Sequence, residues 1–95
     1  MKALLHVLNK PADHPRFRRC IAAIGPGDSL VLREAAALAL HEPGAIPDDG
    51  SFHLYVIQRD LETIMAGNEP PGQCRPVDDR GFIQLICEHQ APIFW

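Results

Sequence analysis

The chain has 95 residues, of which 46% are apolar and 22% are charged, and its net charge is −3. This length fits a single domain, and a domain this small buries only about 60–65% of the surface that its unfolded chain exposes, so partner contacts are expected to supplement its core. The local basic patch of Lys10, Arg16, Arg18 and Arg19 is too small to favour nucleic acid as a direct partner, and we interpret it as a solvated helix face.

The first apolar run, residues 3–8, is interrupted by His6 and followed by Lys10. It is too short for a signal peptide or a membrane span, so no membrane association is expected. An odd number of cysteines, three, without an export signal indicates reduced thiols. The sequence therefore predicts a cytoplasmic protein.

The first half of the chain predicts two strand–helix units. Residues 3–8 are short and mostly apolar, as in a buried strand. A helix over 15–24 carries its apolar residues on one face and ends at the Gly-Pro-Gly of 25–27. A second strand at 29–32 precedes a short helix at 34–40, which is rich in alanine and leucine.

The third unit follows a loop at 43–50 that is rich in proline, glycine and aspartate, and to which we assign no chemistry. Residues 52–57 predict a strand. Asp60 lies where a helix N-cap is expected, and Gly67 is expected to end that helix.

The last unit is less regular. Residues 74–77 predict a weak fourth strand, since Pro76 cannot donate a backbone hydrogen bond and suits a sheet edge or a strand end. A helix over 79–89 is followed by a short apolar tail at 92–95.

The alternation of strands and helices predicts an α/β fold. We expect one domain over residues 1–95, with an open, mainly parallel sheet of four or five strands flanked by helices, because each parallel crossover needs a connecting element. Ligands and partners of such doubly wound sheets meet the carboxyl ends of the strands. Those ends are expected near residues 6–10, 32–34, 57–60 and 77–79.

Several kinds of chemistry lack their sequence signatures. The first strand is followed by Asn-Lys-Pro-Ala at 9–12, without the glycine-rich loop that binds phosphates, so no cofactor is predicted. Cys87 and His89 are close in sequence but point in different directions on a helix, so no metal site is predicted. Ser29 and Ser51 lie outside nucleophile-elbow sequences, which argues against a serine hydrolase.

Cysteine chemistry remains, and Cys20 is the candidate for it. Arg16 and Arg19 lie within one helical turn and favour the thiolate, which is the form that accepts sulfur as a persulfide. The helical register instead places Cys20 on the apolar face, where a simple packing role is expected. Cys74 has no specific activating neighbour, and Cys87 is expected to be structural.

Ile93, Phe94 and Trp95 are candidate interface residues. Chain ends normally fray, so three large apolar side chains in this place need a surface that buries them. They either dock on the protein's own sheet or insert into a neighbouring subunit, where tryptophan is often a hot spot.

Over nearly its full length the sequence resembles the TusB/DsrH family of sulfur-relay proteins, within the DsrE/DsrF/DsrH-like superfamily. The order and spacing of short segments carry the resemblance. In chain order these are Leu5-His6-Val7-Leu8-Asn9-Lys10, Gly27-Asp28, Leu30-Val31-Leu32, Glu34, Leu54-Tyr55-Val56, Asp60-Leu61, Val77-Asp78, Phe82, Leu85, His89 and Trp95.

The resemblance implies a subunit of a hetero-oligomeric complex that passes persulfide sulfur between protein cysteines. It implies homologous TusC/DsrF-like and TusD/DsrE-like partners and a TusE/DsrC-like sulfur acceptor. The sulfur serves 2-thiolation of the tRNA wobble uridine in the Tus branch and sulfur oxidation in the Dsr branch. The principal cysteine belongs to the TusD/DsrE-like subunit, so this chain is expected to complete the assembly without catalysing the transfer alone.

The sequence also departs from the family pattern. Ala35 and Ala36 replace the usual Asp-Gly after Glu34, and Pro11-Ala12 replaces the usual Ser-Pro after Lys10. The first change puts in doubt the contact that this turn normally makes. Cys20 matches a cysteine of DsrH-type members, which tilts the resemblance toward that branch or toward a TusB-type protein with an auxiliary thiol.

Three hypotheses follow. The first is an assembly subunit, which in isolation is expected to form homo-oligomers in place of its missing partners. The second is a sulfur carrier that uses Cys20. The alternative is a doubly wound domain that binds a small molecule and has no sulfur chemistry. The expected fold is the only feature that supports this alternative.

Overall fold

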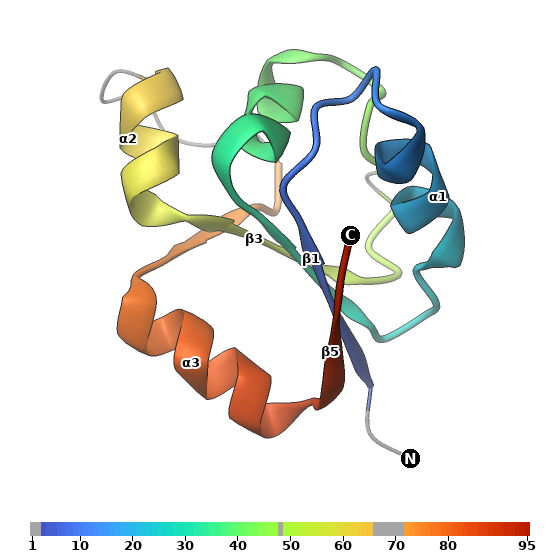
Figure 1. Cartoon of the computed structure of the whole chain (residues 1–95), viewed down its shortest axis with the longest axis vertical. Helices are drawn as coiled ribbons and strands as arrows, with labels where there is room; N and C mark the ends of the chain where they lie inside the picture. Colours follow the sequence, from blue (N-terminus) through green and yellow to red (C-terminus); the bar gives the residue numbers. More distant parts are fainter. Residues whose placement is uncertain (1–2, 48, 66–71) are drawn as a thin grey trace.

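The computed structural model of the protein describes residues 3–47, 49–65 and 72–95, and its strands form one parallel sheet in the order β4-β3-β2-β1-β5 (Figure 1). The strands are β1 Leu4–Leu8, β2 Ser29–Leu32, β3 His53–Ile57, β4 Arg75–Val77 and β5 Gln90–Phe94. The helices are α1 Pro15–Ala23, the 3-10 helix η1 Glu34–His41, α2 Gln58–Met65 and α3 Asp79–Glu88. All four strand pairings are parallel, which confirms the predicted α/β class.

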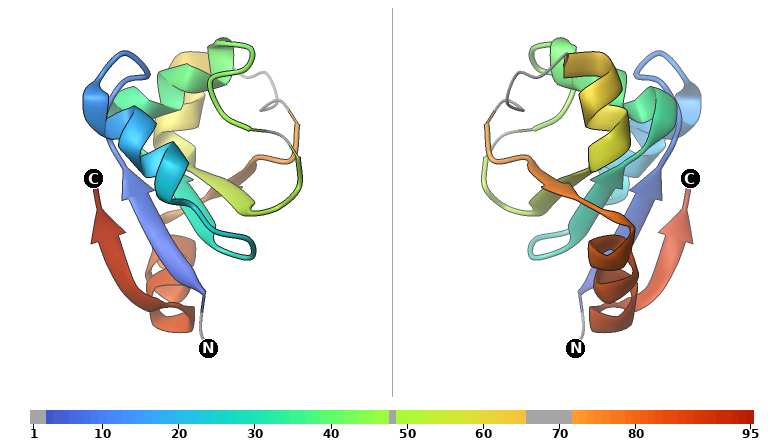
Figure 2. Two further views of the ribbon diagram at one scale, coloured as in Figure 1. Left: turned by 90° about the vertical axis from the view of Figure 1, so that its right-hand side faces the viewer. Right: turned by 90° about the vertical axis from the view of Figure 1, so that its left-hand side faces the viewer.

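The strand order decides which face each helix covers. From β1 to β4 every connection moves one strand in the same direction, whereas α3 leads from β4 back across the sheet to β5. Because parallel crossovers are right-handed, α1, η1 and α2 are expected on one face and α3 on the other. Figures 1 and 2 show α3 separated from the other three helices by the sheet.

Side chains alternate along β1 between two apolar clusters. Leu5 and Val7 pack with Leu85 of α3 on one face. Leu8 belongs to the larger cluster on the opposite face, with Phe17 and other residues of α1, η1 and α2. A strand contributes every second residue to the same face, so β1, an interior strand of the sheet, supplies both layers of the core.

The alanine-rich segment after β2 forms a 3-10 helix over Glu34–His41, where the sequence predicted a short helix without its type. Its buried alanines include Ala36 and Ala39, which are three residues apart. A 3-10 helix has three residues per turn and places such residues on the same side. Small side chains at this spacing let the helix lie close to the sheet.

Two predicted boundaries are wrong. Asp60 is not an N-cap, because α2 begins at Gln58 directly after β3, and the Asp60 carboxylate instead accepts a hydrogen bond from the Glu34 backbone N–H. The tail expected at residues 92–95 belongs to a strand that starts earlier: Gln90–Phe94 forms β5, an edge strand beside β1, with an irregular register between Leu4 and His6. The predicted helix end at Gly67 lies outside the described residues.

Within the described parts of the chain, every helix is too short or too polar to cross a lipid bilayer.

Candidate functional site

Charged side chains gather where β2, β3 and β4 end. Arg59 donates a 2.8 Å hydrogen bond to Asp79, and Arg33 lies 3.7 Å from the Glu34 carboxylate. The Arg33 guanidinium also lies 5.9 Å from the ring centre of Phe82 on α3. These groups are exposed or half-exposed, so each pair adds little stability. Arg59 and Asp79 also line a cleft of about 240 Å³, together with Ile57, Gln58, Glu62 and Asp78.

The turn after β2 has an unusual backbone. Glu34 has φ = 52°, and it is the one non-glycine residue with positive φ in the described part of the chain. Its N–H donates a 2.9 Å hydrogen bond to Asp60. Glycine adopts this conformation without a steric cost, but glutamate does not. The hydrogen bond to Asp60 of α2 therefore holds Glu34 in a conformation that its side chain disfavours.

The crevice at the carboxyl ends of β1 and β5 is occupied by the protein itself. The strand order diverges from β1 in both directions, and this is the point at which doubly wound sheets bind ligands. Here Lys10 donates hydrogen bonds to Asn9 at 2.6 Å and to the Trp95 carbonyl at 3.2 Å. The Trp95 N–H donates to the Val7 carbonyl at 2.9 Å. No ligand group is needed to satisfy these polar atoms.

A buried histidine connects the two ends of the described chain. His6 is 1% exposed, and its ring is stacked against the Trp95 indole with 6.1 Å between ring centres. The indole N–H donates to His6 Nδ1 at 3.2 Å, and the His6 Nε2 lies 3.1 Å from an Asp28 carboxylate oxygen. An indole nitrogen is only a donor, so this geometry assigns the proton of the neutral ring to Nε2. Sequence reasoning missed this network, although a histidine within an apolar strand was its signal.

Asp28 is the acceptor at the centre of this network. Its side chain is mostly buried, and it accepts backbone hydrogen bonds from Gly25 at 2.9 Å and from Leu4 at 3.1 Å. Burial raises the pKa of its carboxyl, but the hydrogen bonds from Gly25, His6 and Leu4 outweigh it and hold that pKa below its ordinary value. Asp28 thus fastens β1, β2 and the end of α1 to each other.

Ser29 and His89 form a pair at the amino end of β2. The Ser29 hydroxyl lies 2.8 Å from His89 Nε2, and His89 Nδ1 lies 2.6 Å from the Leu85 carbonyl. The carbonyl can only accept, so Nδ1 carries the proton and Nε2 accepts from the serine. A hydrolase base would be oriented in this way, but Ser29 is 1% exposed and out of reach of a substrate. The pair instead anchors the end of α3 to β2.

The structure places two of the three cysteines in the core. Cys20 is 0% exposed and Cys74 is 6% exposed, and burial raises the pKa of each thiol from 9.0 to about 12. Burial keeps the Cys20 thiol protonated, which argues against activation by Arg16 and Arg19 and favours the packing interpretation. Cys87, which was expected to be structural, is exposed on α3.

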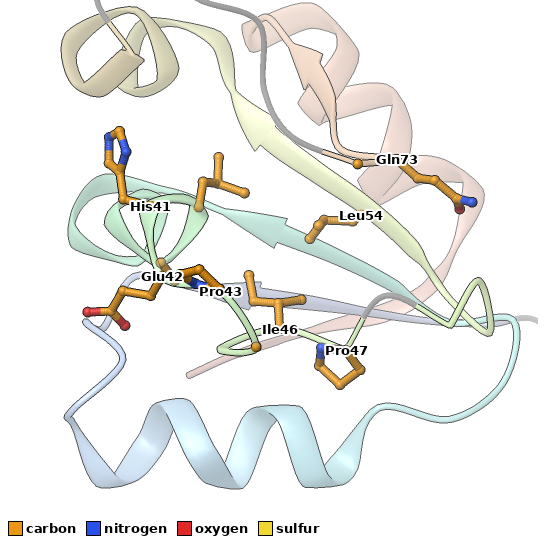
Figure 3. Close-up of a pocket in the computed structure, with 11 residues that line it drawn as sticks. His41, Glu42, Pro43, Ile46, Pro47, Leu54 and Gln73 are labelled. Carbon is orange, nitrogen blue, oxygen red and sulfur yellow. The ribbon is translucent and has the colours of Figure 1, made fainter.

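A cavity of about 300 Å³ lies between η1, the loop that follows it and β3 (Figure 3). Its wall is mainly apolar, with Ile46, Pro47 and Leu54 among the lining side chains. His41 at its rim is already bonded, since its Nε2 lies 3.0 Å from the Ile64 carbonyl. The Glu42 carboxylate points away from the other labelled side chains. The cavity thus offers apolar contact but few directed polar groups.

The three interface candidates divide between two roles. Trp95 packs against the protein's own core, as one of the two predicted alternatives required. Phe94 is 61% exposed and Ile93 is 36% exposed, so they remain available to a neighbour. Phe94 is in register with Val7 and so lies on the α3 face of the sheet.

Within the described residues, no three histidine, cysteine, aspartate or glutamate side chains lie close enough to hold a metal ion. No protein-family model matches the sequence, and no curated protein matches it either. The resemblance to the TusB/DsrH family therefore stays a prediction.

Proposed function

We propose that this protein is an assembly subunit of a cytoplasmic sulfur-relay complex of the TusB/DsrH type and carries no sulfur itself. One observation carries the proposal. The edge strand β5 exposes Phe94 at 61% and Ile93 at 36%, while the cysteine that resembles a sulfur carrier, Cys20, is 0% exposed. The exposed apolar side chains on an edge strand suit a subunit that binds partners. The inaccessible thiol implies that the partners carry the sulfur.

The partners in this proposal are TusC/DsrF-like and TusD/DsrE-like proteins, with a TusE/DsrC-like acceptor reached through the complex. β5 has one neighbour, β1, so its outer edge has backbone groups that a partner can cover. Pro92 interrupts the donors along β5, which limits direct strand pairing. We therefore expect the contact to rely on the Phe94 side chain and the adjoining α3 face more than on strand addition.

The alternative, a small-molecule-binding domain, has less support. The crevice where doubly wound sheets bind ligands is closed by Lys10 and Trp95. The cavity beside Leu54 has few polar groups to orient a ligand.

Co-expression with its TusC/DsrF-like and TusD/DsrE-like proteins, followed by native mass spectrometry, tests the assembly. We expect a stable complex that contains all three chains. Phe94→Gln should remove this chain from the complex, whereas Leu38→Gln should not, although Leu38 on η1 is also 50% exposed. A chain that binds neither partner contradicts the proposal, whether it stays a monomer or forms homo-oligomers.

Peptide mapping of the purified complex after incubation with a persulfide donor tests the division of labour. The sulfane sulfur should appear on the TusD/DsrE-like subunit. Cys20 should carry none, because its thiol is buried and protonated. Persulfide on Cys20 in the folded complex would instead assign it the carrier role.

A further inference from the structure

A second surface lies on the opposite side of the core from α3. It is a groove of about 510 Å³ between α1 and the loop at residues 42–45. Its lining is largely apolar and has one charge on each rim, and consists of Ala12, Phe17, Arg18, Ile21, Ala22, Glu42, Pro43, Gly44 and Ala45. No residue of the β5 interface takes part in it, so this groove is independent of the assembly proposed above.

The helix beside the groove has an unusual charge distribution. Arg16, Arg18 and Arg19 are exposed on α1, and among residues 3–47, 49–65 and 72–95 no carboxylate forms an ion pair with them. All three lie in the first half of the helix, whose first turn holds no acidic residue. Cations near a helix N-terminus are unfavourable, so this arrangement does not serve the stability of α1. It concentrates positive potential beside an apolar groove.

The charge is also segregated along the chain. Residues 10–19 hold four basic side chains and one acidic side chain, a net charge of +3 in a chain whose total is −3. An acidic partner would be repelled by most of the surface and attracted by this face. Complementary charge of this kind selects both the partner and its orientation.

We propose that this groove docks a segment of a partner protein that combines apolar side chains with carboxylates. The apolar side chains occupy the space beside Ile21 and Ala22, and the carboxylates face Arg18 and its neighbours on α1. Glu42 on the opposite rim disfavours negative charge on that side, so the segment binds with its carboxylates toward α1.

The same groove suits a nucleic acid poorly. Single strands bind through aromatic side chains on which their bases stack, and the one aromatic residue of the lining, Phe17, is 2% exposed. The apolar walls also offer the phosphates of a nucleic acid few hydrogen-bond donors. An acidic peptide fits both the charge of α1 and the character of the lining.

Fluorescence anisotropy with the full chain and a labelled peptide of alternating glutamate and leucine tests the proposal. The peptide should bind, and affinity should fall with added salt. Replacing its glutamates by lysine, or its leucines by serine, should each weaken binding by at least about tenfold. A labelled oligouridylate of equal charge should bind more weakly than the glutamate–leucine peptide.

Two matched pairs of variants locate the site. Arg18→Glu should lower the affinity about tenfold, whereas Arg80→Glu on α3, an equal change in net charge at an exposed position, should not. Ala22→Trp should block the groove, whereas Ala23→Trp, at the next exposed position of α1, should leave binding unchanged. Absence of peptide binding, equal effects within a pair, or tighter binding of the oligouridylate would each overturn the proposal.

Discussion

At the scale of single residues, burial and not the neighbouring charge determines the chemistry of the cysteines. Cys20 is close in sequence to Arg16 and Arg19, which predicted a thiolate, but its side chain points into the core while both arginines are exposed. Sequence distance along a helix does not say which side of the helix faces water. The helical register did favour the packing role, and the structure agrees with that interpretation.

The buried thiols make the free energy of unfolding depend on pH in the alkaline range. In the unfolded chain they lose their protons above pH 9.0, whereas in the folded protein they keep them to about pH 12. The unfolded state then binds fewer protons, so the free energy of unfolding should fall between these values by about 1.4 kcal/mol per pH unit for each thiol.

Urea unfolding at several alkaline pH values measures this slope. Cys20→Ala together with Cys74→Ala should reduce it, whereas Cys87→Ala should leave it unchanged because Cys87 is exposed. A slope that does not respond to the double substitution would show that neither core thiol contributes.

Asp28 should be among the residues that matter most for stability. Asp28→Ala leaves the N–H groups of Gly25, Leu4 and His6 without their acceptor, at a cost of about 3 kcal/mol in the free energy of unfolding. The folded carboxyl has a lowered pKa, so its contribution is present above pH 3.8 and is lost as the pH falls through the lower folded value.

Chemical denaturation near neutral pH and in acid measures the cost and its pH dependence. Asp13→Ala is the matched control, because Asp13 is exposed and no hydrogen bond involves its side chain in the described structure. An Asp28→Ala variant as stable as this control would contradict the role of the network.

At the scale of elements, the junction between β2 and η1 stores backbone strain at Glu34, where φ is 52°. Glu34→Gly should stabilise the protein by about 1 kcal/mol, because glycine adopts this conformation without a steric penalty. The side chain that is lost forms only an exposed contact with Arg33.

The neighbouring substitution Ala35→Gly supplies the comparison for Glu34→Gly. It should destabilise the protein by about 0.5–1 kcal/mol, since Ala35 lies within η1 and its φ is not positive. Urea unfolding measures both variants. Equal losses in the two would indicate that the Glu34 turn carries no strain.

The elements themselves could mostly be predicted, and the exceptions have local causes. Strands β1 to β3 follow from short apolar runs. The prediction of Asp60 as an N-cap failed because α2 starts without a loop after β3, and a contact with Glu34 takes the carboxylate. The strand β5 was missed because five residues containing Pro92 have a weak strand pattern of their own. Their pairing with β1 supplies what the local sequence lacks.

At the scale of the whole molecule, β5 adds an edge strand to the sheet and brings the last described residues beside the first strand. Figure 1 shows this last strand beside the first. Trp95→Ala removes both the stacking on His6 and the hydrogen bond to its ring, and should cost about 2 kcal/mol. Trp95→Phe keeps an aromatic ring and should cost about 1 kcal/mol.

Hydrogen exchange shows where the Trp95 substitutions act. Backbone amides of β5 should exchange faster in Trp95→Ala, whereas amides of β2 and β3 should change little, because their pairing does not involve β5. Unchanged exchange in β5 would mean that strand pairing with β1 alone holds the edge.

The sequence by itself determined the class of fold, because alternating apolar runs of strand and helix length can bury their faces only in a layered α/β arrangement. It also identified Ile93, Phe94 and Trp95 as residues that need an apolar surface. Only the tertiary structure decided that Trp95 docks on His6 while Phe94 stays exposed, and that Cys20 is inaccessible. These outcomes depend on contacts between residues far apart in the chain, and local patterns do not encode which distant surface a side chain meets.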